Sequence, residues 1–504
     1  MNSLRSFNNS WTRSIIKTRR TIAVPRIRQA RRNKYMVATA NPAKDTTGIH
    51  VTHVIKGETR LGTESEYSSG GTKFLTPKLD LRELVWPRTE PGPAFDLKLA
   101  EVLDLLIATG DALRRDKDGF MAEAAEQARL NSPYDPGVIQ RSYQRLPDHF
   151  SRDRAMSLIE GELRDARVLD EWVPFKNRLG GVGAIRAFPP RLVHVMAGNA
   201  PNVAASTIIR SSILKGVHLL KLPSNDLFTA PAILRTMAAV APGHPTVRSF
   251  SAVYWRGGDA SVEDVIFRPQ YFDKLVAWGG EGAIKSAKNY IGPGFELVAF
   301  DPKTSISIIG KEALASPERI AETAELAASD STVFNQAACT SSRFHYVEAE
   351  NDETLDQYCA ELQKRMGVER RTASVYAQKV PAELQEEIET LKSFDDMYRV
   401  WGDYDGKGLV IRSEEPLDMY PDGKIVNVVR VPNLSAAIRY ATVATQTVGV
   451  YPANRKAEIR NALASVGVQR VITLGGAESM IPGMSHDGFF PLHRMTRWVN
   501  DEGV

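Results

Sequence analysis

Residues 191–222 read RLVHVMAGNAPNVAASTIIRSSILKGVHLLKL, and this stretch decides the fold. Two short apolar runs, 191–197 and 217–222, have the length and composition of buried strands. Residues 203–215, between the two runs, are predicted to form a helix. The order strand, helix, strand predicts a parallel sheet with helices on its faces.

The same alternation continues on the C-terminal side. Further buried strands are predicted at 250–255, 272–278, 295–299 and 305–309, and a long helix is predicted at 312–329. A second set of strands and helices follows up to residue 474. We therefore predict an α/β protein with a Rossmann-like cofactor-binding domain at 172–330 and an α/β catalytic domain at 331–480. The boundary between them is expected near Asp330.

The regions that flank these domains look different. Residues 37–171 are predicted to be an N-terminal extension with one strand at 49–55, followed by a helical region. Its helices are expected at 95–115, 120–130 and 152–169. Residues 481–504 form a polar and aromatic C-terminal tail that can fold back over a cleft.

The bulk composition is that of a soluble globular protein with more than one domain: 504 residues, 43% hydrophobic and 25% charged. The two cysteines, Cys339 and Cys359, do not indicate a disulfide framework, so a reducing, cytoplasmic location is expected. The sequence has no run of 18 apolar residues, and no membrane span is predicted.

The net charge of +4 conceals an asymmetry between the start of the chain and the rest. Residues 1–35 hold ten basic and no acidic side chains, so the rest of the chain has a net charge of −6. Residues 1–36 are predicted to be a basic extension that is either disordered or a targeting segment. Met36 is an alternative initiator, and a nucleic-acid arm is the least favoured interpretation.

Residues 333–343 read VFNQAACTSSR and place Cys339 between a predicted helix and a predicted strand. A cysteine attacks as its thiolate, whose pKa of about 8.5 falls beside backbone N–H donors or cations. The small neighbours of Cys339 leave room for a substrate carbonyl group. Taken alone, a buried structural cysteine is the alternative, and this interpretation is retained for Cys359.

Three other segments lie at the carboxyl ends of predicted strands, where parallel sheets bind their ligands. Asn199 can donate from its carboxamide to a developing oxyanion, or it can cap a helix. Lys221, near Ser224, can bind ribose hydroxyls or a phosphate, or it can be a solvated surface lysine. The Gly279-Gly280 turn lets a phosphate approach a helix N-terminus, although the G-x-G-x-x-G fingerprint is absent.

Glu296 lies inside a predicted apolar strand, where an uncompensated charge is costly. It can serve as a general base near the thiol, or it can be a paired structural carboxylate. The histidines are too scattered to indicate a metal site, and none is predicted.

Taken in order, residues 193–205 (VHVMAGNAPNVAA), the strand end at Lys221 and residues 335–343 (NQAACTSSR) resemble the aldehyde dehydrogenase superfamily. The more specific resemblance is to the LuxC-type acyl-CoA reductases, which supply fatty aldehyde for bacterial luminescence. It extends roughly from Trp172 to the C-terminus and implies an aldehyde-dehydrogenase-like fold. It also implies that Cys339 is the nucleophile that accepts the acyl group.

The resemblance assigns roles to the other candidates. Asn199 and the backbone N–H of Cys339 would form the oxyanion hole. The adenosine ribose would contact Lys221 and Ser224, and Gly279 and Gly280 would lie against the cofactor phosphates. Glu296 matches the general-base position only approximately, because the segment reads FELVAF where hydrolytic members have two glycines after Glu-Leu.

The resemblance also points to a cofactor and a reaction. NAD-preferring members tend to carry a glutamate three residues after the strand-end lysine, and this chain has Ser224 there, so NADPH is expected to be accepted and preferred. The expected reaction is NADPH-dependent reduction of an acyl-CoA, or another activated acyl group, to the aldehyde through a cysteine acyl-enzyme. An acyl-protein synthetase or acyltransferase subunit is an implied partner, and a homo-oligomer is expected.

Two alternatives remain at this point. One is NAD(P)-dependent oxidation of an aldehyde to an acid, with Glu296 activating water. The other is a non-catalytic scaffold subunit that holds an acyl-activating partner.

Overall fold

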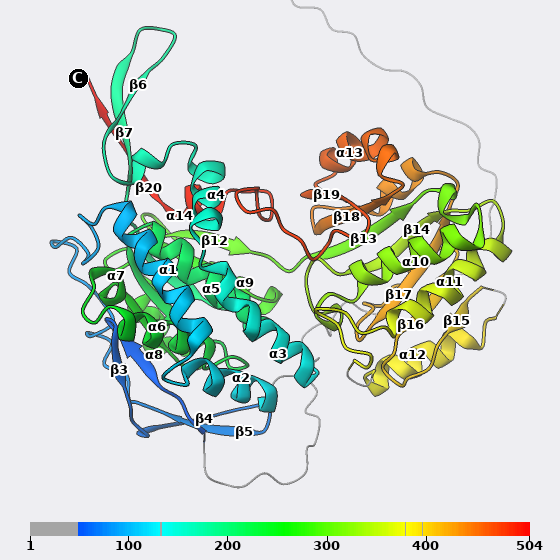
Figure 1. Cartoon of the computed structure of the whole chain (residues 1–504), viewed down its shortest axis with the longest axis horizontal. Helices are drawn as coiled ribbons and strands as arrows, with labels where there is room; N and C mark the ends of the chain where they lie inside the picture. Colours follow the sequence, from blue (N-terminus) through cyan, green and yellow to red (C-terminus); the bar gives the residue numbers. More distant parts are fainter. Residues whose placement is uncertain (1–48, 132–133, 378–379, 396, 504) are drawn as a thin grey trace, which may run out of the picture. The chain divides into compact units, whose positions relative to one another are not determined.

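The computed structural model describes residues 49–131, 134–377, 380–395 and 397–503 (Figure 1). The chain divides into a short unit, residues 1–39, and a compact unit, residues 40–504, to which all described residues belong. The basic extension predicted for residues 1–36 therefore lies outside the described residues.

A seven-stranded sheet, called here the first sheet, holds the stretch that decides the fold. Its strand order is β12-β11-β8-β9-β10-β2-β3. Five strands are mutually parallel, and β2 and β3 add an antiparallel edge. The strands are β8 (Arg191–Val195), β9 (Val217–Lys221), β10 (Phe250–Val253), β11 (Lys274–Trp278), β12 (Glu296–Phe300), β2 (His53–Ile55) and β3 (Glu58–Arg60).

Both faces of the first sheet are covered, because alternate residues of each strand pack into different hydrophobic clusters. Leu192 and Leu220 pack with one set of helices, whereas Val193 and Leu219 pack with another. The first set is α1 (Leu99–Arg115), α5 (Pro201–Ile213) and α6 (Thr229–Val240), and the second is α8 (Ala260–Ile266) and α9 (Glu281–Lys288). The predicted βαβ unit at 191–222 is confirmed.

The end of α5 shows how the sequence sets this crossover. Lys215 has a left-handed backbone (φ 55°), and Gly216 follows it. A Cβ atom at Gly216 would lie 2.1 Å from the carbonyl oxygen of Pro190, so only glycine fits between the helix end and the neighbouring strand. The buried ammonium of Lys215 donates to the carboxylate of Asp170 at 2.8 Å and to the carbonyl of Leu97 at 3.0 Å.

The helical region before the first sheet is also present. It contains α1, α2 (Phe120–Asn131), α3 (Pro136–Arg145) and α4 (Arg152–Leu163), with short 3₁₀ turns at Leu146–His149 and Ala166–Leu169. The strand predicted at 49–55 is interrupted. Its first part, β1 (Ile49–His50), joins a small sheet with β4 (Ser65–Ser69) and β5 (Thr72–Thr76), and its second part becomes β2.

The second sheet also has seven strands, in the order β15-β16-β17-β14-β13-β18-β19. All are parallel except β15. The strands are β13 (Thr304–Ile309), β14 (Ser342–Glu348), β15 (Arg399–Trp401), β16 (Leu409–Ser413), β17 (Ile425–Val431), β18 (Thr445–Tyr451) and β19 (Arg470–Thr473). Helices α10 (Pro317–Ser331) and α11 (Asp352–Met366) cover one face, and α13 (Lys456–Ser465) covers the other.

The structure changes from one sheet to the other between β12 and β13, at Asp301–Lys303, whereas the sequence placed the boundary near Asp330. Both strands are short apolar runs, and periodicity cannot tell which sheet a buried strand joins. The division of the chain into five domains stays a prediction.

The C-terminal residues form a strand that the sequence did not predict. Strand β20 (Arg497–Glu502) pairs with β7 (Val182–Phe188), which in turn pairs with β6 (Val173–Lys176). This pairing joins residues about three hundred positions apart, for example Phe188 with Arg497, and local sequence patterns do not report it. Within the described ranges, no helix is long and apolar enough to cross a membrane.

Candidate active site

The carboxyl ends of the parallel strands in the first sheet carry four of the predicted site residues. Lys221 ends β9, and Gly279 and Gly280 follow β11 directly. Asn199 lies in the turn after β8, which is flanked by β9 on one side and β11 on the other. The chain therefore winds in opposite directions from β8, and such a switch point is where open α/β sheets bind ligands.

The turn that contains Asn199 lies directly against the turn that contains Ser224. A Cβ atom at Gly198 would lie 2.2 Å from the Oδ1 atom of Asn225, so the two turns approach closely only because residue 198 is glycine. Helix α5 begins after Ala200 and has no side-chain cap, so Asn199 is not a helix cap. Its side chain is exposed and makes no hydrogen bond within the described residues, which leaves the carboxamide able to donate to a ligand.

Lys221 is largely buried, with 8% of the residue exposed, and burial lowers the pKa of its ammonium group, although the negative charge of Glu263 opposes the shift. It lies 5.6 Å from the ring centroid of Trp255 and 5.8 Å from that of Tyr254. Within the described part of the chain it forms no ion pair or hydrogen bond. A buried cation without a partner is costly, and the hydroxyls or phosphate of a bound nucleotide would supply one. The donor set therefore fits a nucleotide cofactor.

The Gly279-Gly280 turn is open. No atom lies within 4 Å of the position that a Cβ atom at Gly280 would take, and this residue is the N-cap of α9. Just before the turn, Trp278 stacks on Phe300 with their ring centroids 3.5 Å apart. A phosphate can approach the first turn of α9 without meeting a side chain on these glycines.

Cys339 follows a turn with a strained backbone. Phe334, Asn335 and Gln336 have consecutive positive φ angles of 50°, 51° and 75°, which residues other than glycine rarely adopt. Such geometry costs on the order of 1–3 kcal/mol per residue and persists only where the surroundings enforce it.

Two carboxamides enforce the strained turn. Asn335 donates to the hydroxyl of Ser374 at 2.8 Å and accepts from its backbone N–H at 3.0 Å. Gln336 donates to the carbonyl of Ile425 at 2.7 Å and accepts from the N–H of that residue at 3.0 Å. The turn is thus tied to β17 and to the loop at Ser374, and it fixes the start of the Cys339 segment. Both residues belong to the 333–343 segment, and no local pattern indicates their role.

Cys339 is exposed to solvent, but protein atoms surround much of its side chain. This desolvation raises the pKa of the thiol, and the negative charge of Asp487 raises it further. A hydrogen bond with Gln446 and the backbone N–H groups of Cys339 and Thr340 act in the opposite direction. Because the net shift is upward, the resting group at neutral pH is the thiol. Cys359, in contrast, is fully buried on α11.

Gln446 and Asp487 are site residues that sequence reasoning did not select. The Nε2 atom of Gln446 donates to the Oδ1 atom of Asp487 at 2.6 Å, and the same carboxamide contacts Cys339. The side chain of Asp487 is 6% exposed, and burial raises its pKa. Its backbone is left-handed (φ 51°) in a short turn between His486 and Phe489. The sequence signal was the His-Asp-Gly turn in the tail that was expected to fold back over a cleft.

Asp487→Asn and Gln446→Leu are expected to move the pKa of Cys339 in opposite directions. Loss of the carboxylate charge lowers it, because a nearby negative charge opposes ionisation of the thiol. Loss of the Gln446 hydrogen bond raises it. The rate of iodoacetamide alkylation of Cys339 as a function of pH measures both shifts, and the exposed Asp418→Asn is the matched control. A common direction for the two variants would contradict this electrostatic arrangement.

Glu296 is not brought together with the other candidates. It is the first residue of β12 and pairs in register with Lys274, at the amino ends of these strands and at the opposite edge from Trp278 and Phe300. Its carboxylate is exposed and accepts from the ammonium of Lys274 at 3.2 Å. This ion pair agrees with the interpretation of Glu296 as a paired structural carboxylate, and its role as a general base stays a prediction.

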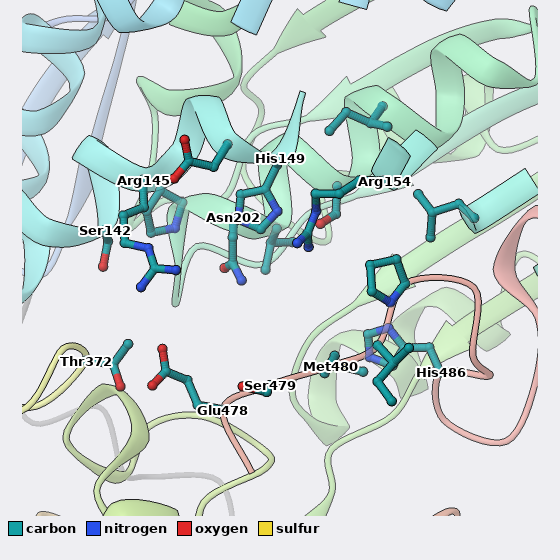
Figure 2. Close-up of a pocket in the computed structure, with 18 of the residues that line it drawn as sticks. Ser142, Arg145, His149, Arg154, Asn202, Thr372, Glu478, Ser479, Met480 and His486 are labelled. Atoms are coloured by element: carbon teal, nitrogen blue, oxygen red, sulfur yellow. The ribbon is translucent and has the colours of Figure 1, made fainter. Parts of the chain in front are cut away.

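A cavity of about 410 Å³ lies beside the candidate site (Figure 2). Its wall includes Asn202, near the Asn199 turn; Phe334, in the strained turn; and His486, which precedes Asp487. Loop 478–486 contributes the other wall, and this loop is held at its base because Asp330 accepts from the backbone N–H groups of Gly475 and Ala477, both at 2.8 Å. The cavity is therefore bounded by segments that adjoin the Asn199 turn, the strained turn before Cys339 and Asp487.

Comparison with known proteins identifies relatives over most of the chain. The family model described as "Acyl-CoA reductase (LuxC)" matches residues 94–498. A long-chain acyl-protein thioester reductase from Photorhabdus luminescens is 28% identical over 426 residues, covering 81% of this chain and 83% of the relative. A protein of the same name from Vibrio harveyi is 26% identical and covers 70% of this chain and 72% of the relative.

Solved structures of aldehyde dehydrogenases have the same fold. An NADP-dependent glyceraldehyde-3-phosphate dehydrogenase from Bacillus halodurans matches with a TM-score of 0.64 and 14% identity, over 90% of this chain and 99% of that one. An NAD-dependent benzaldehyde dehydrogenase from Corynebacterium glutamicum matches with a TM-score of 0.65 and 14% identity, over 90% and 97% of the two chains. The aldehyde-dehydrogenase-like α/β fold predicted from the sequence is confirmed.

Proposed function

The chain belongs to the LuxC family of acyl-CoA reductases and is an oxidoreductase, and we propose that it reduces an acyl thioester to the aldehyde through an acyl-enzyme on Cys339. The observation that carries the proposal is the accessible thiol of Cys339, held after a strained and clamped turn beside a cavity. Structural cysteines are normally buried and inert, as Cys359 is.

In the first step, the Cys339 sulfur forms a bond to the thioester carbonyl carbon, and the carbon–sulfur bond to the leaving thiol breaks. The proton of Cys339 must leave as the bond forms, and the leaving thiolate must gain one. Asp487 is near enough to raise the pKa of the thiol. Because the pKa of its own carboxyl group is raised, the carboxylate of Asp487 is a better proton acceptor than an ordinary aspartate, and it can take up this proton and return it to the leaving thiolate. The proton that Cys339 loses is thus the one that the leaving thiolate gains, and acyl transfer needs no proton from outside the site.

The negative charge on the carbonyl oxygen requires hydrogen-bond donors in the transition state. We assign these to the carboxamide of Asn199 and the backbone N–H of Cys339. The free carboxamide of Asn199 supports this role, because a donor already engaged by the protein could not turn toward the oxyanion.

When bound, a nicotinamide cofactor supplies the hydride that converts the acyl-enzyme to aldehyde and frees the thiolate. Lys221 and Ser224 would bind the adenosine ribose, and the Gly279-Gly280 turn would lie against the phosphates. The main support for this assignment is Lys221, which is largely buried and has no ion pair or hydrogen bond among the described residues. Glu296, which would activate water in the oxidative alternative, is ion-paired at the other edge of the sheet, and this supports the reductive direction.

The cofactor is proposed to be NADPH, because Ser224 offers a small neutral side chain where a carboxylate would repel a 2′-phosphate. Ser224→Glu is expected to lower the ratio of kcat/KM for NADPH to that for NADH by about 10-fold or more, since like charges brought together are strongly unfavourable. Steady-state kinetics with both cofactors measure the ratio. Ser224→Gln, of similar size and uncharged, is the matched control, and an equal loss in both variants would indicate a steric cause.

The acyl group is proposed to be of medium or long chain length. It would arrive as a CoA thioester, or from an acyl-protein synthetase or acyltransferase partner. The enzyme itself is proposed to be a homo-oligomer of this chain. The relatives named long-chain acyl-protein thioester reductases support this range. The direct test is intact-mass measurement after incubation with a panel of acyl-CoAs without reductant. A mass increase equal to one acyl group, located at Cys339 and discharged by NADPH, is the expected result. An unmodified protein with every thioester would overturn the proposed function.

A further inference from the structure

One wall of the cavity is strongly basic. It is built by α3, the following 3₁₀ turn, α4 and α5, which all lie on one side of the first sheet. Figure 2 shows Arg145, His149, Arg154 and Asn202 along this wall. Five arginines in total line the cavity, against the acidic side chains of Asp148 and Glu478.

Most of these charges are already paired. Arg141 binds Glu369 at 2.6 Å, and Arg371 binds Glu478. Arg210 faces Glu162 at 3.7 Å, and Asp148 binds Arg114 at 3.1 Å. Among the residues that the structure describes, Arg145 and Arg154 form no ion pair or hydrogen bond through their side chains. The cavity thus presents two free guanidinium groups and no free carboxylate.

Two further observations show that this wall has a surplus of positive charge and donors. The Nε atom of Arg210 is buried and has no hydrogen-bond partner. The pKa of His149 is lowered to about 4, first by burial and then by the positive charges of Arg154 and Arg145, with Asp148 opposing. The imidazole is therefore neutral at pH 7, and the positive charges of both free arginines act on it.

The chemistry of the wall selects a class of ligand. A guanidinium group presents paired N–H donors that match a phosphate in geometry and charge. A fatty acyl chain carries no charge, so within the thioester substrate any anionic group lies on the other side of the thioester sulfur. The volume of about 410 Å³ falls in the range of small-molecule sites.

We propose that Arg145 and Arg154 form a subsite for the phosphate of a phosphopantetheine thioester, which holds the carrier portion of the substrate in the cavity while its acyl end reaches Cys339. This inference rests on the proposed function and concerns the leaving group, not the acyl chain. Phosphopantetheine occurs both in coenzyme A and on acyl carrier proteins, and the subsite recognises the chemistry that they share.

The test compares thioesters that differ only in the leaving thiol: decanoyl-CoA, a decanoyl carrier protein, and decanoyl N-acetylcysteamine, which has no phosphate. The variant is Arg145→Gln together with Arg154→Gln. We expect KM for the phosphorylated substrates to rise by about 10–100-fold, because each lost hydrogen bond to a charged group is worth roughly a tenfold change. The kinetic constants for the N-acetylcysteamine thioester should stay within twofold of the wild-type values.

Arg152→Gln is the matched control. Arg152 is exposed on α4, the helix that also carries Arg154, but it pairs with Asp104 and does not line the cavity. A rise in KM for both phosphorylated substrates supports a site for the phosphopantetheine phosphate. A rise with only one of them supports the subsite and names the source.

Two results would overturn the inference. One is an unchanged KM for both phosphorylated substrates, and the other is an equal rise for the N-acetylcysteamine thioester. In either case the wild-type enzyme still forms aldehyde and the proposed function stands. A wild-type protein that reduces none of the three thioesters would instead remove the proposed function. Circular dichroism of the double variant verifies that it is folded.

Discussion

Replacement of Cys339 by alanine is expected to lower aldehyde formation by roughly 10⁴-fold or more, because removal of a covalent nucleophile eliminates the path through the acyl-enzyme. The same variant should carry no radioactivity after incubation with labelled decanoyl-CoA and denaturation. Retained labelling together with retained aldehyde formation would show that another residue accepts the acyl group.

The second cysteine provides the matched control. Cys359→Ala removes a thiol that is 0% exposed within the hydrophobic cluster of α10 and α11. We expect full acyl labelling and near wild-type kinetics, with a small loss of thermal stability from the cavity that the substitution leaves. Loss of labelling in this variant would place the reactive thiol at Cys359.

Replacement of Asn199 by alanine is expected to lower kcat by about 10²–10³-fold, the effect of removing one oxyanion-hole donor. Binding of the thioester should change little, because the hydrogen bond strengthens as negative charge develops on the carbonyl oxygen. Rapid-mixing measurement of acyl-enzyme formation separates this step from hydride transfer.

The control for Asn199 is Asn461→Ala, which replaces an exposed asparagine on α13 by a good helix former. It should leave kcat unchanged. If Asn199→Ala raised KM and left kcat unchanged, Asn199 would contribute to ground-state binding and not to the oxyanion hole.

The strained turn before Cys339 is held in place by residues that are distant in the sequence. Residues 334–336 hold an unfavourable backbone conformation, and Asn335 and Gln336 offset part of its cost through four hydrogen bonds to Ser374 and Ile425. These partners lie on segments of the chain 39 and 89 residues away. The position of the nucleophile therefore depends on the folded second sheet, and not on the local sequence around Cys339.

The sequence by itself determined the fold class and supplied most of the candidate site residues. The apolar runs at 191–197 and 217–222 specify buried parallel strands, and ligands bind where such strands end, so Asn199, Lys221 and Gly279 could be selected from their position after a strand. Cys339 could be selected only together with these segments and the resemblance that they carry, because a lone cysteine among small residues is more readily a buried structural thiol. These features are local, and a local pattern can report them.

The tertiary structure decided what depends on distant pairing. Strand β20 pairs with β7, and β13 joins the second sheet, although both are short runs with no local mark of their partner. Glu296 lies at the amino edge of its sheet because the register of β12 against β11 places it there. Asp487 reaches Gln446 only because the C-terminal segment returns to the second sheet, and Arg145 and Arg154 face a cavity only because three helices meet. Local patterns indicated some of the candidate residues, but the partners of these residues, and the presence of Gln446 and Asp487 among them, were decided by packing between segments far apart in the chain.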